Sequence, residues 1–309
     1  MTSSSTTTRK AAVGSTGAGA GLAAAAIAVT VWGGSGVVAK WLPMGSLAIV
    51  AYRFGIYSLI VGGIRALRGQ RLRLFAFRRS MVGGLLLAAD VALFFTAVKH
   101  TTIVNATIIG SLQPLLLTAY GVRFLGEKVQ RRDLVLGLIA LAGVVAIVLG
   151  GTDSGEASIW GDLAALGALS AWSAYFVIAK QVSTEVSPTD FTISAAVIVT
   201  VVNAPLALLF GQSLGWPGTE NMLWILGMAL ASGILGHNLM NWALPRIPLW
   251  LGATFTLFVP VVSSALAWAW LDEPLSVIQM VGMAITVGAL GVLVWFQQAG
   301  LANEPVSGE

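Results

Sequence analysis

The stretch SLQPLLLTAYGVRFLGEK at residues 111–128 has a counterpart 146 positions later, LFVPVVSSALAWAWLDEP at residues 257–274. Each stretch places a proline inside an apolar run and a glutamate 13 positions after that proline. These residues are Pro114 with Glu127 and Pro260 with Glu273. A repeated pattern of this kind indicates that the chain contains an internal duplication.

A second correspondence supports the duplication. A shift of 140 positions carries residues 32–40 onto residues 172–180, and both segments begin with Trp and end with Ala-Lys. Duplicated helical halves inside a membrane are the basis of many carriers.

Composition places the chain in a membrane. Apolar residues make up 57% of it, charged residues only 10%, and the mean hydropathy is +0.86. Soluble domains carry about 25% charged residues. The apolar runs are about 20 residues long, the length of a membrane-spanning helix. They predict ten spans, at about residues 20–41, 45–67, 80–99, 102–124, 132–151, 158–181, 188–210, 221–244, 249–270 and 275–297.

The short connections leave no room for a separate catalytic or nucleotide-binding domain, and the chain has no phosphate-binding loop motif. Any energy source must therefore be a gradient. With no Cys and two His residues, disulfides are excluded and a metal site is disfavoured. We expect no cofactor and no metal. We also expect no nucleic-acid partner, because the positively charged residues are distributed as membrane topology requires.

Placing the N-terminus in the cytoplasm gives a strong positive-inside signal. Of the 17 Lys and Arg residues, 14 then fall inside, two fall outside, and Arg53 lies within a helix. We therefore expect a multi-pass protein of a bacterial inner (cytoplasmic) membrane with both termini cytoplasmic. The expected organisation is a disordered N-terminus at residues 1–19, five-helix repeats at residues 20–151 and 152–297, and a cytoplasmic tail at residues 298–309.

Five helices in each half is an odd number, so the second half must enter the membrane from the opposite side. The predicted fold class is thus an all-α polytopic membrane protein of ten transmembrane helices, built as two inverted five-helix repeats around a central cavity.

Three short motifs add a family resemblance. Trp32-Gly33 in the first helix, Arg53-Phe54 in the second and Gly126-Glu127 after the fourth occur in this order. Over residues 20–297 the chain resembles the drug/metabolite transporter superfamily. Within that superfamily it is most similar to the EamA-type branch, and there to bacterial exporters of aromatic amino acids and metabolites. The resemblance implies a ten-helix basket that exports small organic solutes by alternating access.

Polar residues in the middle of predicted helices are the first candidates for a solute site. Asp90 lies about ten residues from the inner end of helix 3, where an ionised carboxylate costs about 2.5–3.5 kcal/mol. On helix 8, His237 and Asn241 are four residues apart and share a face. We expect helices 3, 4, 8 and 9 to enclose a pocket, with helices 1, 2, 6 and 7 shifting to open it. Alternatively, Asp90 bonds a neighbouring helix.

The two prolines lie within predicted helices 4 and 9. Each proline displaces a carbonyl four residues earlier, at Gly110 and Thr256, and that carbonyl needs a new donor. A bound solute or water is one donor, and a packing kink repaired by Ser and Thr is the alternative. Trp32 and other deep aromatic residues are candidate pocket walls. The expected cavity residues are Asp90, Phe94, Asn105, Gln113, Trp172, Tyr175, His237, Asn238, Asn241, Trp242 and Thr256.

The remaining candidates are structural or gating residues. They are Arg53, Pro114, Pro260, Glu127 and Glu273. Glu127 and Glu273 each precede a predicted helix, where a carboxylate complements the positive N-terminal end of the helix dipole.

The sequence therefore predicts a secondary transporter and not an enzyme. The family resemblance implies that it exports amino acids, preferably aromatic or bulky neutral ones, or related metabolites. Its partners are the small-molecule solute and the lipid bilayer. A proton-coupled multidrug or metabolite exporter of the same fold is the alternative, with protons as a further partner. The oligomeric state stays open, and a monomer is compatible with the sequence.

Two rivals belong to other classes. Residues 33–36, Gly-Gly-Ser-Gly, resemble the nucleophile segment of intramembrane serine proteases, with His237 as the base. A passive channel is disfavoured, because no charged ring or filter repeat is present. A scaffold is disfavoured, because Asp90, Arg53 and His237 within the membrane are costly without a use.

Overall fold

The computed structural model describes residues 5–70, 72–100, 103–151, 158–272 and 274–302, and every element in these ranges is a helix. The first half contains α1 (Ser5–Trp41), α2 (Ser46–Leu67), α3 (Leu74–His100), α4 (Ile103–Gly110), α5 (Gln113–Phe124) and α6 (Arg131–Gly150). The second half contains α7 (Ile159–Val182), α8 (Pro188–Leu209), α9 (Thr219–Leu230), the π-helix η1 (Ala231–Asn238), α10 (Leu239–Ala243), α11 (Leu249–Phe255), α12 (Phe258–Leu271) and α13 (Val277–Ala302).

These helices form ten membrane spans, as expected. Eight spans in the described residues are long and apolar enough by composition alone, counting α9–η1–α10 and α11–α12 as one span each. The other two are α3, which carries Arg78, Arg79 and Asp90, and the interrupted span α4–α5.

The first helix begins earlier than expected. We expected residues 1–19 to be disordered, but α1 starts at Ser5. Extending an existing helix by one residue costs little compared with starting one, and Ala favours the helix. The Ala-containing segment before residue 20 therefore continues the apolar helix. At the other end, α13 runs to Ala302, past the expected boundary at residue 297.

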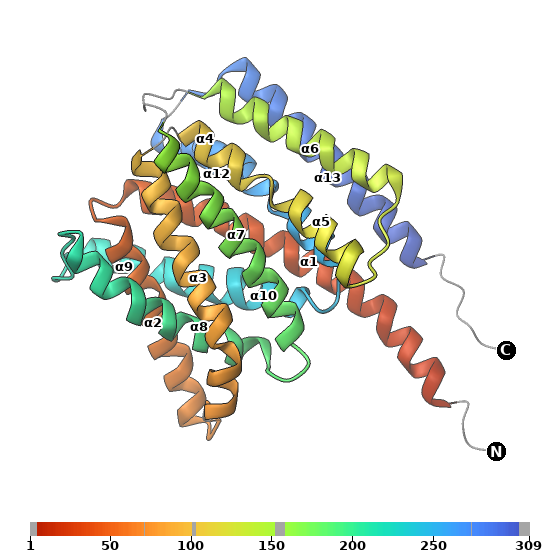
Figure 1. Ribbon diagram of the computed structural model, residues 1–309, viewed down its shortest axis with the longest axis horizontal. Coiled ribbons are helices and arrows are strands. Elements are labelled where there is room, and N and C mark those ends of the chain that lie inside the picture. The colour runs from red at the N-terminus through yellow and green to blue at the C-terminus, as the bar shows by residue number, and fades with distance from the viewer. Residues whose placement is uncertain (1–4, 71, 101–102, 152–157, 273, 303–309) are drawn as a thin grey trace.

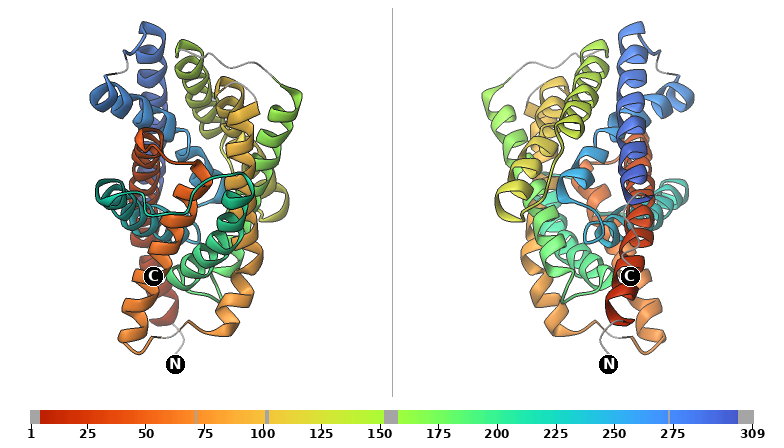
Figure 2. Two further views of the ribbon diagram at one scale, coloured as in Figure 1. Left: turned by 90° about the vertical axis from the view of Figure 1, so that its left-hand side faces the viewer. Right: turned by 90° about the vertical axis from the view of Figure 1, so that its right-hand side faces the viewer.

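The helix packing follows the inverted repeat. Two pairs consist of equivalent elements from the two halves: α2 with α8 and α6 with α13. The interrupted spans also pack on each other, through α5 of the first half and α11 of the second. The remaining large contacts come in matched sets. Helix α1 packs on α12 and on η1–α10, and its counterpart α7 packs on α4–α5 and on α3. Figure 2 shows the α1–α9–α12 group and the α3–α7–α8 group on opposite sides of the molecule.

The interrupted spans define two ends of the molecule. Helices α5 and α11 pack together, whereas α4 and α12 are not among the packed pairs of described elements. In Figure 1, α5 points toward the end where α1 starts and α13 finishes. The interrupted spans thus touch at this end, which we call the termini end, and diverge toward the opposite end.

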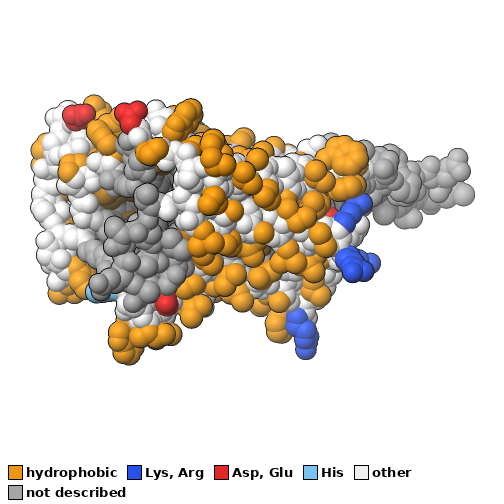
Figure 3. Space-filling model, turned by 90° about the horizontal axis from the view of Figure 1, so that it is seen from above, with side chains coloured by type: hydrophobic (Ala, Val, Ile, Leu, Met, Phe, Trp, Pro, Cys, Tyr) orange, Lys and Arg blue, Asp and Glu red, His pale blue; other side chains and the backbone are white. Residues whose placement is uncertain are grey.

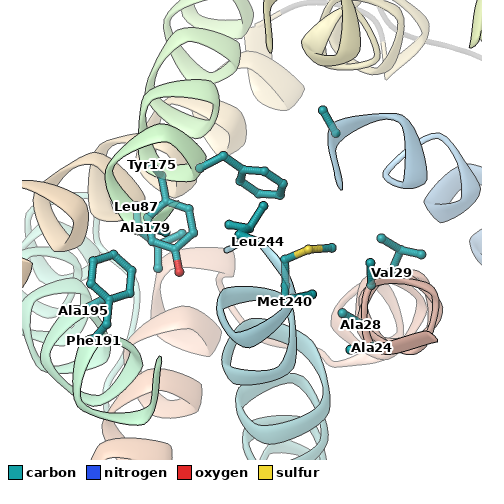
Figure 4. Packing of buried hydrophobic residues seen from close by; sticks show 14 of the residues in the cluster. Ala24, Ala28, Val29, Leu87, Tyr175, Ala179, Phe191, Ala195, Met240 and Leu244 are labelled. Atoms are coloured by element: carbon teal, nitrogen blue, oxygen red, sulfur yellow. The ribbon is translucent and has the colours of Figure 1, made fainter. Parts of the chain in front are cut away.

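The distribution of side chains on the surface and in the core is that of a membrane protein. On the face in Figure 3, hydrophobic side chains cover the middle of the molecule, and the Lys and Arg side chains gather at the termini end. Inside, the main cluster joins helices of both halves. Figure 4 shows Tyr175 of α7 near Phe191 of α8, with Leu87 of α3 and Met240 of α10 in the same cluster.

Candidate functional site

His237 lies at the centre of an aromatic cluster. It is 5% exposed, and its surroundings come from α1, α2 and α7 rather than from helices 3, 4 and 9. The distances from its ring centroid are 5.2 Å to Trp32, 5.3 Å to Phe54, 6.3 Å to Trp172 and 6.5 Å to Tyr175. The rings of Phe54 and Tyr175 are 3% and 1% exposed, so four aromatic rings enclose one buried imidazole. Such rings supply apolar faces together with polar edges. We call these five residues the aromatic cluster.

A π-helix presents His237 to these rings. Segment η1 interrupts the span that the sequence predicts as one regular helix over residues 221–244. Its glycines allow close packing: a Cβ at Gly233 would overlap the ring of Tyr57, and one at Gly236 would come within 2.5 Å of Trp32 Nε1. Such π segments inside α-helices are frequent at functional sites, because the wider turn re-aims side chains.

Several polar atoms in this region have no hydrogen-bond partner among the described residues. They are both ring nitrogens of His237, Trp32 Nε1, Tyr57 Oη, Ser232 Oγ and Asn238 Oδ1, all fully buried atoms. Buried polar groups in folded proteins are almost always paired, so each exception needs a reason. Donors and acceptors that stay available for a solute are such a reason.

Asn241 differs from His237, because its amide is already bonded. Its Nδ2 donates to the Tyr175 hydroxyl at 2.8 Å and to Thr192 Oγ1 at 3.0 Å. The side chain therefore ties α10 to α7 and α8. The sequence placed Asn241 in the cavity, and the structure places it directly behind the aromatic cluster, where it orients Tyr175.

Asp90 sits half-buried on α3. Within the described part of the chain it has no hydrogen bond and no ion pair. Phe94, one turn later, is 39% exposed. Asn105 belongs to α4, but its side chain lies outside the described residues. A carboxylate at this depth, with no cation beside it, is free to receive a proton or a solute ammonium group.

The two interruptions meet through a side-chain hydrogen bond. Thr256 Oγ1, at the end of α11, donates to Gln113 Oε1, at the start of α5, at 3.1 Å. Gln113 is 1% exposed, and its Nε2 has no partner among the described residues. Gln113 and Thr256, both named as candidates from the sequence, are therefore in direct contact where α5 meets α11.

The prolines break their spans instead of bending them. Pro114 stands in the first turn of α5, and Pro260 in the first turn of α12. The expectation of a freed carbonyl at Thr256 is wrong, because Val259 N donates to it at 3.0 Å. A proline is tolerated in a first turn, where its missing N–H would have had no partner. Each span therefore restarts as a new helix.

Trp242 and Arg53 lie at the edges of the region. The Arg246 guanidinium stacks 3.7 Å from the centre of the Trp242 ring, so this tryptophan faces the loop after α10 and not His237. Arg53 Nη1 donates to Ser35 Oγ at 2.9 Å. Ser35 pairs with Arg53, and neither nitrogen of His237 has a partner in the part of the chain that the structure describes. The described residues therefore contain no Ser35–His237 hydrogen bond to support the protease alternative.

Glu127 has a different role from the expected one. It was expected to complement the start of the helix that follows it, α6. Instead, its carboxylate accepts hydrogen bonds from Leu249 N at 2.7 Å and Trp250 N at 3.3 Å, at the start of α11. Lys180 Nζ donates to the same carboxylate at 2.8 Å. The physical effect, a carboxylate at a helix N-terminus, is the expected one, but the helix belongs to the other repeat. Glu273 lies outside the described residues.

Sequence reasoning missed Phe54, Tyr57 and Lys180. Phe54 and Tyr57 are buried on the α2 face that meets η1. The available signals were the paired glycines of η1 and the Ala-Lys ending shared by residues 32–40 and 172–180.

Known proteins resemble the chain over 48% to 84% of its length. YetK of Bacillus subtilis (strain 168), named an uncharacterized transporter, is 25% identical over 202 residues, which are 64% of this chain and 61% of YetK. A probable amino-acid metabolite efflux pump of Salmonella typhimurium is 25% identical over 281 residues, 84% of this chain and 92% of the pump. The aromatic amino acid exporter YddG of Ancylobacter novellus is 27% identical over 153 residues, 48% of this chain and 51% of the exporter.

A crystal structure shares the fold. It superposes with a TM-score of 0.74 at 19% sequence identity and covers 89% of this chain and 97% of its own. The sequence model of the EamA-like transporter family matches this chain twice, over residues 19–149 and 159–295. Since the two matches cover both five-helix halves, this multi-pass membrane protein belongs to the EamA-like transporter family of the drug/metabolite transporter superfamily.

Proposed function

We propose that the protein exports small organic solutes by alternating access, with amino acids, preferably aromatic or bulky neutral ones, as the main class. The observation that carries this proposal is the aromatic cluster, in which both nitrogens of His237 and the indole N–H of Trp32 are buried without a partner. Rings suit an apolar side chain, and unpaired donors and acceptors suit a carboxylate or an ammonium group. The printed names of the efflux pump and of YddG support the same class.

The proposed setting is a bacterial inner membrane with both termini in the cytoplasm. Most Lys and Arg residues then lie on the cytoplasmic side, which supports this orientation. In this orientation the termini end faces the cytoplasm. Because α5 and α11 pack together at that end, the proposed state of the transporter is closed toward the cytoplasm.

Counterflow in proteoliposomes tests the proposal. Vesicles loaded with one unlabelled amino acid are diluted into a panel of labelled ones, and uptake is expected to saturate and to be strongest for aromatic solutes. We expect His237→Ala and Trp172→Ala each to raise the half-saturating concentration about tenfold, the loss of about 1.4 kcal/mol of binding. Trp295→Ala is the control, because this side chain is 63% exposed and packs on Phe296, away from the cluster. Flux that never saturates, or equal loss in all three variants, would contradict the proposed site.

Proton coupling is the second candidate, and Asp90 favours it. This half-buried carboxylate has neither a hydrogen bond nor an ion pair among the described residues, so it is able to exchange a proton during transport. Export driven by an imposed pH gradient is then expected in the wild type and absent in Asp90→Asn, while counterflow without a gradient persists in both. If Asp90→Asn responds to the gradient like the wild type, Asp90 is not the coupling residue.

A further inference from the structure

Glu127 joins three elements at the termini end. Its side chain is 10% exposed and receives Lys180 of α7 together with the first backbone N–H groups of α11. Lys180 Nζ also donates to Ile247 O at 2.7 Å, in the loop before α11. A buried carboxylate with three donors is a strong, charge-assisted junction. It connects the end of α5 to α7 and α11, two helices on which α5 packs.

The second repeat shows another position for the equivalent half-helix. There, α12 lies flat against α1: Ser263 Oγ donates to Gly33 O at 3.0 Å, and a Cβ on Gly33 would come within 2.6 Å of Val262. The counterpart of α12 in the first repeat is α5, and the counterpart of α1 is α7. By the shifts of 146 and 140 positions, Leu117 corresponds to Ser263 and Ser173 to Gly33.

In the first repeat the corresponding contact is partial: Gln181 Nε2 of α7 donates to Tyr120 Oη of α5 at 3.3 Å, but the two helices do not pack along their length. A cleft of about 300 Å³ lies between α3, α5 and α7 where the second repeat is tightly packed. It is lined by Leu116 and Leu117 of α5, Leu86 of α3, and Ser173 and Val177 of α7. Ser173 is 7% exposed, and its hydroxyl has no partner among the described residues. Helix α5 instead packs on α11.

We propose that α5 is a gate with two docking positions, held on α11 by Glu127 in this state and received by the α3–α7 cleft when the termini end opens. The occupant of the cleft is therefore α5 itself, in the arrangement that α12 already has on α1. Pro114 frees α5 from α4, so this half-helix is able to turn without moving the whole span. Opening requires Glu127 to release the N–H groups of α11, which is why this residue sets the balance between the two positions.

The inference rests on the proposed alternating access, but its test reads helix positions and not transport. The chain has no cysteine, so introduced pairs report without background. The pair Leu117→Cys with Ser173→Cys spans the cleft, and the pair Thr118→Cys with Thr254→Cys spans the α5–α11 contact, where both threonines line one small cavity. Disulfide formation with copper phenanthroline is followed in proteoliposomes.

We expect slow cross-linking of the cleft pair and fast cross-linking of the α5–α11 pair in the otherwise unchanged chain. Adding Glu127→Gln is expected to speed the cleft pair at least about tenfold and to slow the other pair, since hydrogen bonds to charged groups are the strong ones. Lys180→Met is the second variant and acts in the same direction without changing the carboxylate.

Glu185→Gln is the matched control. Glu185 forms an ion pair with Arg79 at 2.8 Å, but both side chains are about half exposed, so its loss is expected to change neither rate. The gate is refuted if Glu127→Gln and Lys180→Met leave both cross-linking rates unchanged. It is also refuted if, in the chain without these substitutions, the cleft pair cross-links as fast as the α5–α11 pair. If transport is intact and the cross-linking rates are unchanged, the gate is rejected and the proposed function stands. If transport is absent and the cross-linking rates shift as expected, the gate stands and the proposed function is rejected.

Discussion

Replacing His237 and Asn241 by Leu separates a polar residue kept for the solute from one that holds the fold. Both are buried, at 5% and 2% exposure, and both touch Tyr175. His237 has no hydrogen-bond partner among the described residues, while Asn241 donates two hydrogen bonds. The same apolar substitution is therefore expected to change stability differently at the two positions.

The magnitudes follow from these contacts. His237→Leu removes two unpaired nitrogens, each costing about 1–3 kcal/mol, and loses four ring contacts worth about 0.5–1.5 kcal/mol each. The two effects nearly cancel, so the free energy of unfolding is expected to stay within about 1 kcal/mol. Asn241→Leu loses two hydrogen bonds of about 1 kcal/mol each and leaves the Tyr175 hydroxyl buried without a partner, about 3–5 kcal/mol in total.

Thermal unfolding in detergent and counterflow in vesicles measure the two effects. At about 2–4 °C per kcal/mol, Asn241→Leu is expected to lower Tm by at least about 6 °C, and His237→Leu to move it by less than about 4 °C. His237→Leu is expected to weaken solute affinity tenfold or more, because a solute hydrogen bond is lost. If His237→Leu lowers Tm as much as Asn241→Leu and leaves affinity unchanged, the imidazole is a packing residue and the reasoning fails.

Three further predictions concern packing and topology. Gly143→Leu is expected to disrupt the α6–α13 pair and to give aggregated protein in size-exclusion chromatography, because a Cβ there would meet Gly282 O at 2.7 Å; Gly288→Leu, with open space around it, should elute normally. Gly233→Ala is expected to displace Tyr57 and to reduce counterflow at least about fivefold, an effect of about 1 kcal/mol, whereas Gly227→Ala, which has no neighbour within 4 Å, should transport like the wild type. A fluorescent protein fused after residue 309 should fold and fluoresce in the cytoplasm, while alkaline phosphatase at that position should be inactive; the opposite result would reverse the orientation.

Candidate residues were recognisable before the fold was known, because polar residues in the middle of apolar spans are costly without a use. Of the candidates, Trp172, Tyr175 and His237 lie together in the aromatic cluster. Asp90 and Gln113 lie outside this cluster, and their contact with a solute stays a prediction. The partners were harder to foresee. Helix 8 was expected to face helices 3, 4 and 9, but η1 turns His237 toward α1, α2 and α7. No period of 3.6 residues predicts the wider turn of a π segment.

Glu127 shows the same limit for charged residues. A glutamate before a helix predicts an N-terminal partner, yet the nearest helix along the chain, α6, was the wrong one. Distance along the sequence identifies local partners, whereas the inverted packing of the two halves brings α11 to the end of α5.

The sequence by itself determined the membrane location, the ten spans, the duplication and its inverted sense, because hydropathy, length and helix parity are properties of a linear chain. Only the tertiary structure decided which helices surround His237, that Pro114 and Pro260 break their spans, and that Glu127 bonds α11. These three features depend on how the two repeats pack against each other. That packing is set by the shapes of the helix surfaces and by hydrogen bonds between segments far apart in the sequence, and a linear pattern does not encode it.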